Sequence, residues 1–138
     1  MKLKKRHISL MLFCGYIAAV AYLCFARPES IPEFKPDLFG IPIDKIVHFT
    51  MFLPFPPLAY TVFCPARKEK WIHLIVLAMI FFIGIGLALG TEKIQGMSEF
   101  RSYEIEDFYA DVMGMEVSTV LTAILIIFKR RSDSPETK

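Results

Sequence analysis

Cysteine and charge are both scarce in this chain of 138 residues, and each shortage excludes a class of protein. The three cysteines are odd in number and widely spaced, so they support neither a disulfide-rich secreted module nor a cysteine-based metal motif. Charged residues make up 22% and hydrophobic residues 54%, which disfavours a disordered chain and a soluble globule. The net charge of +2 is too small to indicate a nucleic-acid partner.

Recognisable catalytic signatures and internal repeats are also missing. There is no Gly-x-Ser-x-Gly, no His-Glu-x-x-His and no phosphate loop. No compact motif joins histidine to carboxylates, so the sequence predicts neither a metal site nor a cofactor. A carrier usually shows repeats, which makes a standalone transporter a weak interpretation.

What the chain has instead is long apolar runs, which cover 80 of its 138 residues. The runs are 19 to 21 residues long and span 8–26, 46–64, 71–91 and 108–128. Each can cross about 30 Å of hydrocarbon as a helix. The first run could instead be a signal peptide, but it exceeds the roughly 7–15 residues of a signal core, so we expect a retained helix.

The runs predict an all-α, polytopic membrane protein with four transmembrane helices in one bundle. Residues 1–7 form a basic tail, 8–128 the membrane domain and 129–138 a tail that we expect to be disordered. Lys and Arg concentrate in 1–7, 65–70 and 129–138, which hold 11 of the 16. By the positive-inside rule, both termini are cytoplasmic and the loops at 27–45 and 92–107, with 9 of the 14 acids, face outward.

Proline and small residues mark two of the spans. Pro54, Pro56 and Pro57 remove amide donors from the second span, which predicts either a kinked helix packed on its neighbours or a broken helix opening a polar cavity. Small residues permit close helix contact within the bundle or between chains. We therefore assign a packing role to Gly84, Gly86, Ala88, Gly90 and Gly114, and an oligomer through these faces is possible.

Polar residues converge on the predicted outer end of the bundle. Asp44, Lys45 and His48 begin the second span, Glu92 and Gln95 end the third, Arg101 lies in the next loop, and Asp107 and Asp111 begin the fourth. Because the spans alternate in direction, all of these groups reach one interface. Two interpretations stay open: a structural plug of ion pairs, or a site for something polar at the outer leaflet.

Glu116 stands apart from this cluster. It lies about 13 Å below Asp107 along a helix, near the bilayer centre. It is also rotated about 140° from Asp111, at about 100° per residue. We expect it to face another helix.

The ordered set of polar motifs resembles the VanZ-like family of small bacterial membrane proteins. The family pattern is Lys-x-x-His-Phe, then Glu-x-x-Gln, an Arg, and Asp-x-x-Ala-Asn-x-x-Gly. The matching segments here run from Lys45 to Phe49, from Glu92 to Gln95, through Arg101, and from Asp107 to Gly114. Asp111 stands where the family has Asn, and an ionised Asp accepts hydrogen bonds but cannot donate them. It must therefore meet Arg101, Lys45 or His48, or hold a proton.

The resemblance implies a multi-pass protein of the bacterial cytoplasmic membrane, with reduced susceptibility to a lipoglycopeptide antibiotic as the phenotype of the named member.

Three function classes stay open, with membrane lipids as partners in each. The preferred one is a module that binds the head group of an amphiphile: a lipid-linked cell-wall precursor, a phospholipid or an antibiotic. The second is a hydrolase or transferase acting on lipid-linked phosphate or ester bonds, with His48 as base or nucleophile. The third is a structural or transport-accessory subunit.

Overall fold

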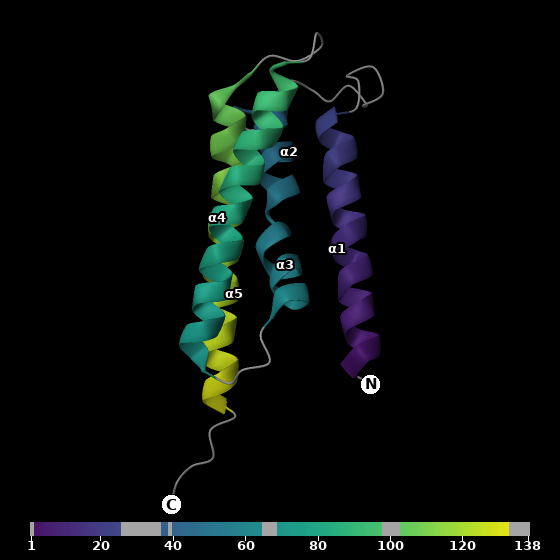
Figure 1. Cartoon of the computed structure of the whole chain (residues 1–138). Coiled ribbons are helices and arrows are strands. Elements are labelled where there is room, and N and C mark those ends of the chain that lie inside the picture. Colours follow the sequence, from purple (N-terminus) through teal and green to yellow (C-terminus); the bar gives the residue numbers. More distant parts are fainter. Residues whose placement is uncertain (1, 26–36, 39, 65–68, 98–102, 133–138) are drawn as a thin grey trace, which may run out of the picture.

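The protein is a bundle of long helices running side by side (Figure 1). The computed structural model describes residues 2–25, 37–38, 40–64, 69–97 and 103–132. Its elements in chain order are α1 (Lys2–Phe25), β1 (Asp37–Leu38), β2 (Ile41–Pro42), α2 (Ile43–Phe52), α3 (Phe55–Phe63), α4 (Lys70–Gln95) and α5 (Ile105–Ser132).

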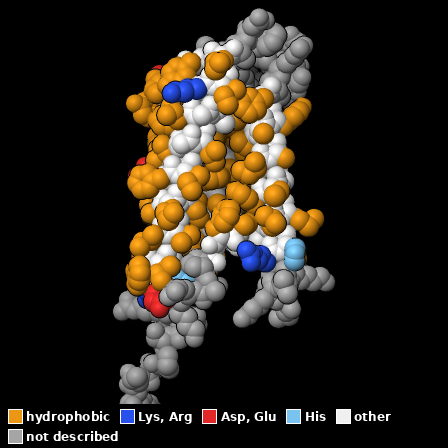
Figure 2. Space-filling view, viewed as in Figure 1, with side chains coloured by type: hydrophobic (Ala, Val, Ile, Leu, Met, Phe, Trp, Pro, Cys, Tyr) orange, Lys and Arg blue, Asp and Glu red, His pale blue; other side chains and the backbone are white. Residues whose placement is uncertain are grey.

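Four helical segments are long and apolar enough to cross a membrane, as the sequence predicts. They are Arg6–Phe25, Ile43–Phe63, Lys70–Gln95 and Ile105–Phe128. The second combines α2 and α3, and the third and fourth extend beyond the predicted apolar runs to include acids of the predicted site. The face seen in Figure 2 carries apolar side chains along most of its length, as a lipid-facing surface requires.

A short β-hairpin, with two residues in each strand, is the only non-helical regular structure among the described residues. β1 and β2 pair antiparallel, with Asp37 opposite Pro42 and Leu38 opposite Ile41. Gly40 in the turn has a φ of 79°, a left-handed conformation that glycine adopts without strain. Most of the loop at 27–45, which we expect to face outward, lies outside the described residues.

The core lies where α5 packs against α2 and α4, while α1 packs mainly against α3. Met115, Ala88 and Ala59 are at most 1% exposed at its centre. Within the apolar stretch of α1, only 6% of the residues are buried, whereas 28–33% are buried in the apolar stretches of the other three spans. The first span is therefore an outer member of the bundle.

Two of the predicted packing glycines touch neighbouring helices. A Cβ on Gly114 would overlap the carbonyl oxygen of Phe49, so only glycine lets α5 approach α2 this closely. A Cβ on Gly84 would lie 2.5 Å from the Met115 sulfur and 2.9 Å from the Phe55 ring. Ala88, one turn from Gly84, is fully buried.

Gly86 and Gly90 do not fit the packing role within the monomer. A Cβ on either would meet nothing within 4 Å. The spacing of four residues puts the pair on one face of α4, but that face points away from the helices that the structure describes. A role in contact between chains stays a prediction.

The second span is interrupted at Leu53 and Pro54, between α2 and α3. Because α3 restarts at Phe55, Pro56 and Pro57 fall in its first turn, where helix amides need no intrahelical partner. The break leaves carbonyls at the end of α2, and the Tyr16 hydroxyl of α1 donates to the Met51 carbonyl at 2.8 Å. A neighbouring helix thus satisfies a carbonyl in the last turn of α2, beside the break.

The two ends of the bundle differ in what they bring together. α1 begins and α5 ends at one of them (Figure 1). At the other, α2 begins, α4 ends and α5 begins. We name this second end the acidic end, after six carboxylates of these segments: Asp44, Glu92, Glu104, Glu106, Asp107 and Asp111.

Candidate functional site

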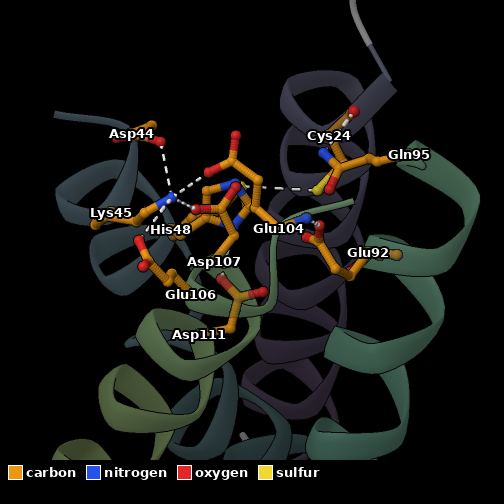
Figure 3. Close-up of polar contacts among 12 residues, drawn as sticks. Cys24, Asp44, Lys45, His48, Glu92, Gln95, Glu104, Glu106, Asp107 and Asp111 are labelled. Carbon is orange, nitrogen blue, oxygen red and sulfur yellow. Dashed lines mark hydrogen bonds and ion pairs between the residues drawn. The ribbon is translucent and has the colours of Figure 1, made fainter. Parts of the chain in front are cut away.

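The acidic end is built from three helix termini that the topology brings to one level (Figure 3). Asp44 lies in the first turn of α2, and Glu106 and Asp107 lie in the first turn of α5. The amide groups of a helix N-terminus carry partial positive charge, which stabilises acids placed there. Local helix electrostatics therefore helps to accommodate this density of carboxylates.

Lys45 lies at the centre of a cage of carboxylates. Its Nζ is 2.5 Å from Asp107 Oδ1, 2.6 Å from Glu104 Oε2 and 3.0 Å from Asp44 Oδ2. The Glu106 carboxylate is more distant, at 3.8 Å. The Lys45 side chain is only 13% exposed, so these charge-assisted bonds occupy its ammonium group fully.

His48 is held between two carboxylates one turn below Lys45. Its Nδ1 lies 3.0 Å from Asp111 Oδ1, and its Nε2 lies 3.5 Å from Asp107 Oδ2. The contact with Asp111 answers the question that the Asp-for-Asn departure raised: Asp111 meets His48. Nδ1 donates to Asp111 when it carries the proton, which leaves Nε2 facing Asp107.

Glu92 reaches the same region from the last turn of α4 and is 1% exposed. Its Oε1 accepts the backbone amide of Glu104 at 2.7 Å, immediately before α5 begins. The carboxylate therefore caps a helix start that would otherwise leave its amide unpaired. Its Oε2 has no hydrogen-bond partner among the described residues, and neither has Asp111 Oδ2.

Acceptors and negative charge exceed donors and positive charge at this end. Lys45 and His48 are the basic side chains in contact with the carboxylates of the acidic end in the described part of the chain. Buried acceptors without partners are costly, by about 1–3 kcal/mol each, and native proteins keep few of them. The arrangement therefore offers unused capacity for a cation or for a hydrogen-bond donor.

One combination has the composition of a cation site. His48, Glu92 and Asp107 each offer one ligating atom, and these atoms lie within 4.8 Å of one another. A second group, Asp44, Glu104 and Asp107, meets the same criterion but is more exposed. The first group could not be predicted from a short sequence motif, because its three residues come from three different helices.

The structure gives two of the predicted site residues other partners and does not place a third. Asp44 bonds to Lys45 rather than to His48, with which it shares a helix face. Gln95 donates to the Cys24 carbonyl at 2.9 Å, so it caps the last turn of α1 from α4. Arg101 lies outside the described residues.

Sequence analysis missed Glu104 and Glu106, which complete the cage around Lys45. Their signal was present in the sequence, since both lie within three residues of Asp107. The sequence pattern alone marks them only as part of an acidic outer surface. Glu104 contributes twice, since its side chain binds Lys45 and its amide binds Glu92.

Glu116 does not face another helix, contrary to the expectation from its rotation. Its side chain is exposed on α5, on the outer surface of the bundle. The rotation of 140° from the buried Asp111 was right, but it turns Glu116 away from the core because the buried stripe of α5 follows Asp111, Met115 and Ser118.

Comparisons with known proteins give distant likenesses. No protein-family model and no solved structure matches the chain. The chain is 25% identical over 122 residues to the Uncharacterized protein C11E3.10 of Schizosaccharomyces pombe, covering 88% of this chain and 65% of that protein. A stretch of 34 residues is 47% identical to the Gene 1 protein of Escherichia phage If1, covering 25% of this chain and 10% of that protein. Neither likeness assigns the chain to a family, so the VanZ-like resemblance stays a prediction.

Proposed function

We propose that this chain is a multi-pass membrane protein whose acidic end binds the polar head of an amphiphile at the membrane surface. The observation that carries the proposal is the pair of carboxylates, Glu92 and Asp111, each 1% exposed and each with an oxygen lacking a partner among the described residues. In a plug that only locked helix ends together, these oxygens would be paired. In a binding site, the ligand supplies the missing donors.

The chemistry of the site favours head groups rich in donors. An ammonium group, an amide or sugar hydroxyls would satisfy the free oxygens, and such groups occur on phospholipids, lipid-linked cell-wall precursors and lipoglycopeptide antibiotics. Lys45 is a weak candidate for phosphate, because three carboxylates already hold it. Arg101 stays the candidate for a phosphate or carboxylate on the ligand.

The orientation is part of the proposal. Basic residues flank the end where α1 begins and α5 ends, so the positive-inside rule puts that end in the cytoplasm and the acidic end outside. If the VanZ-like resemblance holds, the membrane is the bacterial cytoplasmic membrane, and the function belongs to envelope homeostasis or antibiotic tolerance. Cysteine labelling in a background without native cysteines should find Ser98→Cys accessible from outside and Ser132→Cys from inside, and the reverse pattern would overturn this orientation.

The arrangement around His48 favours an enzyme as the second candidate. A histidine with a carboxylate on Nδ1, at 3.0 Å from Asp111, has the orientation of a general base. Its Nε2 would then act on a phosphate or ester bond of a lipid-linked substrate. Turnover of such a substrate, lost in His48→Gln, would decide for this candidate over binding alone.

The proposed function is tested by the amphiphile that copurifies with the full chain in mild detergent. Mass spectrometry of the wild type should find one lipid class enriched over the bulk membrane. Glu92→Gln keeps an acceptor for the Glu104 amide but loses the charge, and we expect it to lose the enriched lipid, as does Arg101→Ala. Glu69→Gln makes the same substitution at an exposed position just before α4 and should retain it. Equal lipid content in all four proteins would overturn the proposal.

A further inference from the structure

The triad of His48, Glu92 and Asp107 has the features of a prepared cation site beyond mere proximity. Imidazole and carboxylate are the ligands that Zn²⁺ and Mn²⁺ accept together. Zn²⁺ binds such ligands at about 2.0–2.2 Å, which puts the ligating atoms about 3–4 Å from one another. His48 Nε2 and Asp107 Oδ2 are already 3.5 Å apart, and each of the three residues has one potential ligating atom within 4.8 Å of those of the other two.

Each of the three side chains is fixed through one atom, which leaves another atom available. Asp111 holds His48 by Nδ1, the Glu104 amide holds Glu92 by Oε1, and Lys45 holds Asp107 by Oδ1. Metal-binding histidines typically carry such a carboxylate on the second ring nitrogen, which fixes the tautomer and orients the ring. The remaining atoms are His48 Nε2 and Asp107 Oδ2, which face each other at 3.5 Å, and Glu92 Oε2, which has no partner among the described residues.

An independent observation points to a bound group here. Glu92 is 1% exposed, and its Oε2 has no hydrogen-bond partner in the described part of the chain. Its surroundings already contain the carboxylates of Asp107 and Asp111. A cation is the species that satisfies an unpaired buried oxygen and offsets this excess negative charge at the same time.

We propose that His48, Glu92 and Asp107 bind a divalent cation of the Zn²⁺ or Mn²⁺ kind, with Asp111, Lys45 and the Glu104 amide positioning the three ligands. Three protein ligands leave at least one coordination position open for water or an oxygen of a head group. The inference deepens the proposed function and rests on it for the exposure of the acidic end to that head group.

Direct metal binding tests the inference on the full chain in detergent, with any polyhistidine tag removed and residual metal stripped by a chelator. We expect the wild type to bind one Zn²⁺ or Mn²⁺ per chain, by calorimetry and elemental analysis, with Mg²⁺ much weaker. Binding should also raise the melting temperature, since a ligand that binds the folded state stabilises it. The absence of saturable binding of both Zn²⁺ and Mn²⁺ overturns the inference.

Two conservative variants remove ligands without removing the contacts that hold the fold. His48→Asn places an amide donor near the former Nδ1, so it keeps the bond to Asp111 and deletes Nε2. Glu92→Gln keeps an acceptor for the Glu104 amide. Each should weaken binding by at least about 100-fold, the upper range for loss of a mere supporting group. His7→Asn and Glu116→Gln make the same changes at exposed positions and should bind as the wild type does.

Pulsed electron paramagnetic resonance of the Mn²⁺ form gives a readout that a purely structural role would not change. Coupling to one imidazole nitrogen should be present in the wild type and in Glu116→Gln, and absent in His48→Asn. Persistent nitrogen coupling in His48→Asn overturns the assignment of His48 as ligand.

Measuring the copurified lipid on the same samples separates this inference from the proposed function. Metal binding in protein without an enriched lipid supports the cation site and overturns amphiphile binding. An enriched lipid in protein that binds neither metal leaves amphiphile binding standing and overturns the cation site.

Discussion

The two ends of the bundle each bury a histidine, and the two histidines differ in the charge of their partners. His73, 2% exposed in α4, receives a neutral partner: its Nδ1 lies 2.7 Å from the Tyr60 hydroxyl, with the Cys64 sulfur 3.8 Å away. His48, 6% exposed, lies between two carboxylates, and one of them, Asp111, has an oxygen without a partner among the described residues. Burial alone therefore does not mark a site; the charge and unused capacity of the partners do.

The sharpest test of this contrast removes the Lys45 ammonium group, which binds the carboxylates of the acidic end. Lys45→Met leaves three carboxylates without the ammonium group they share. We expect the free energy of unfolding to fall by about 2–3 kcal/mol, between the values for exposed and buried ion pairs, because Asp44 and Glu104 are about half exposed. Thermal unfolding in detergent measures the change. Lys93→Met, at an exposed position in the last turn of α4, is the matched control and should have little effect. Equal effects of the two substitutions would show that the cage contributes no more than surface charge.

A second test moves the two helices that carry His48 and Asp111 apart. Gly114→Ala puts a methyl group onto the Phe49 carbonyl, so α5 must shift from α2 and stability should fall by about 1–3 kcal/mol. Gly86→Ala adds the same methyl group into open space and should stabilise α4 slightly, by about 0.5–1 kcal/mol. Denaturation curves of both variants compare them. A destabilised Gly86→Ala would instead indicate that its face is covered by another chain.

A third test measures what the hydrogen bond between Tyr60 and His73 contributes at the opposite end of the bundle. In a double-mutant cycle, Tyr60→Phe and His73→Leu should each lower stability by about 1 kcal/mol and should share most of that loss as coupling. Lipid and metal binding should be unchanged in both. Loss of either binding would assign the opposite end of the bundle a part in function and would remove the contrast.

The smallest expected effect belongs to the outermost member of the cage. Glu106 is 75% exposed and 3.8 Å from Lys45, so Glu106→Gln should change stability by less than about 1 kcal/mol. Glu104→Gln, at 2.6 Å from the same ammonium group, should have a larger effect. The ratio of the two, measured in the same unfolding assay, shows how steeply the cage weakens toward the solvent.

Much of this architecture could be predicted because the length and the order of apolar runs follow simple rules. Apolar length predicted the spans, and the alternating direction of the spans explains why His48, Asp107 and Asp111 lie at one end. Partners were harder to predict. Gln95 has a side chain that would suit a binding site, yet it donates to the Cys24 backbone carbonyl. A pattern of side chains in the sequence does not show which backbone carbonyl a side chain will bind.

The face of a helix was equally hard to predict. Gly84 and Gly86 are both small residues in one apolar span, but one packs against the core and the other faces outward. In a soluble helix, polar residues would mark the outer face; in a span that is apolar all round, that mark is missing. Asp111 and Glu116 illustrate the converse, since their relative rotation was predictable but which of them faced inward was not.

The bond from Tyr16 to Met51 bears on how the protein is made. The chain is synthesised from its N-terminus, so α1 is available before the interrupted span at Ile43–Phe63 follows it. The donor that the break requires is therefore already in place when the acceptor arrives. The first helix, which packs least in the bundle, thus precedes in synthesis the interrupted span whose carbonyl it binds.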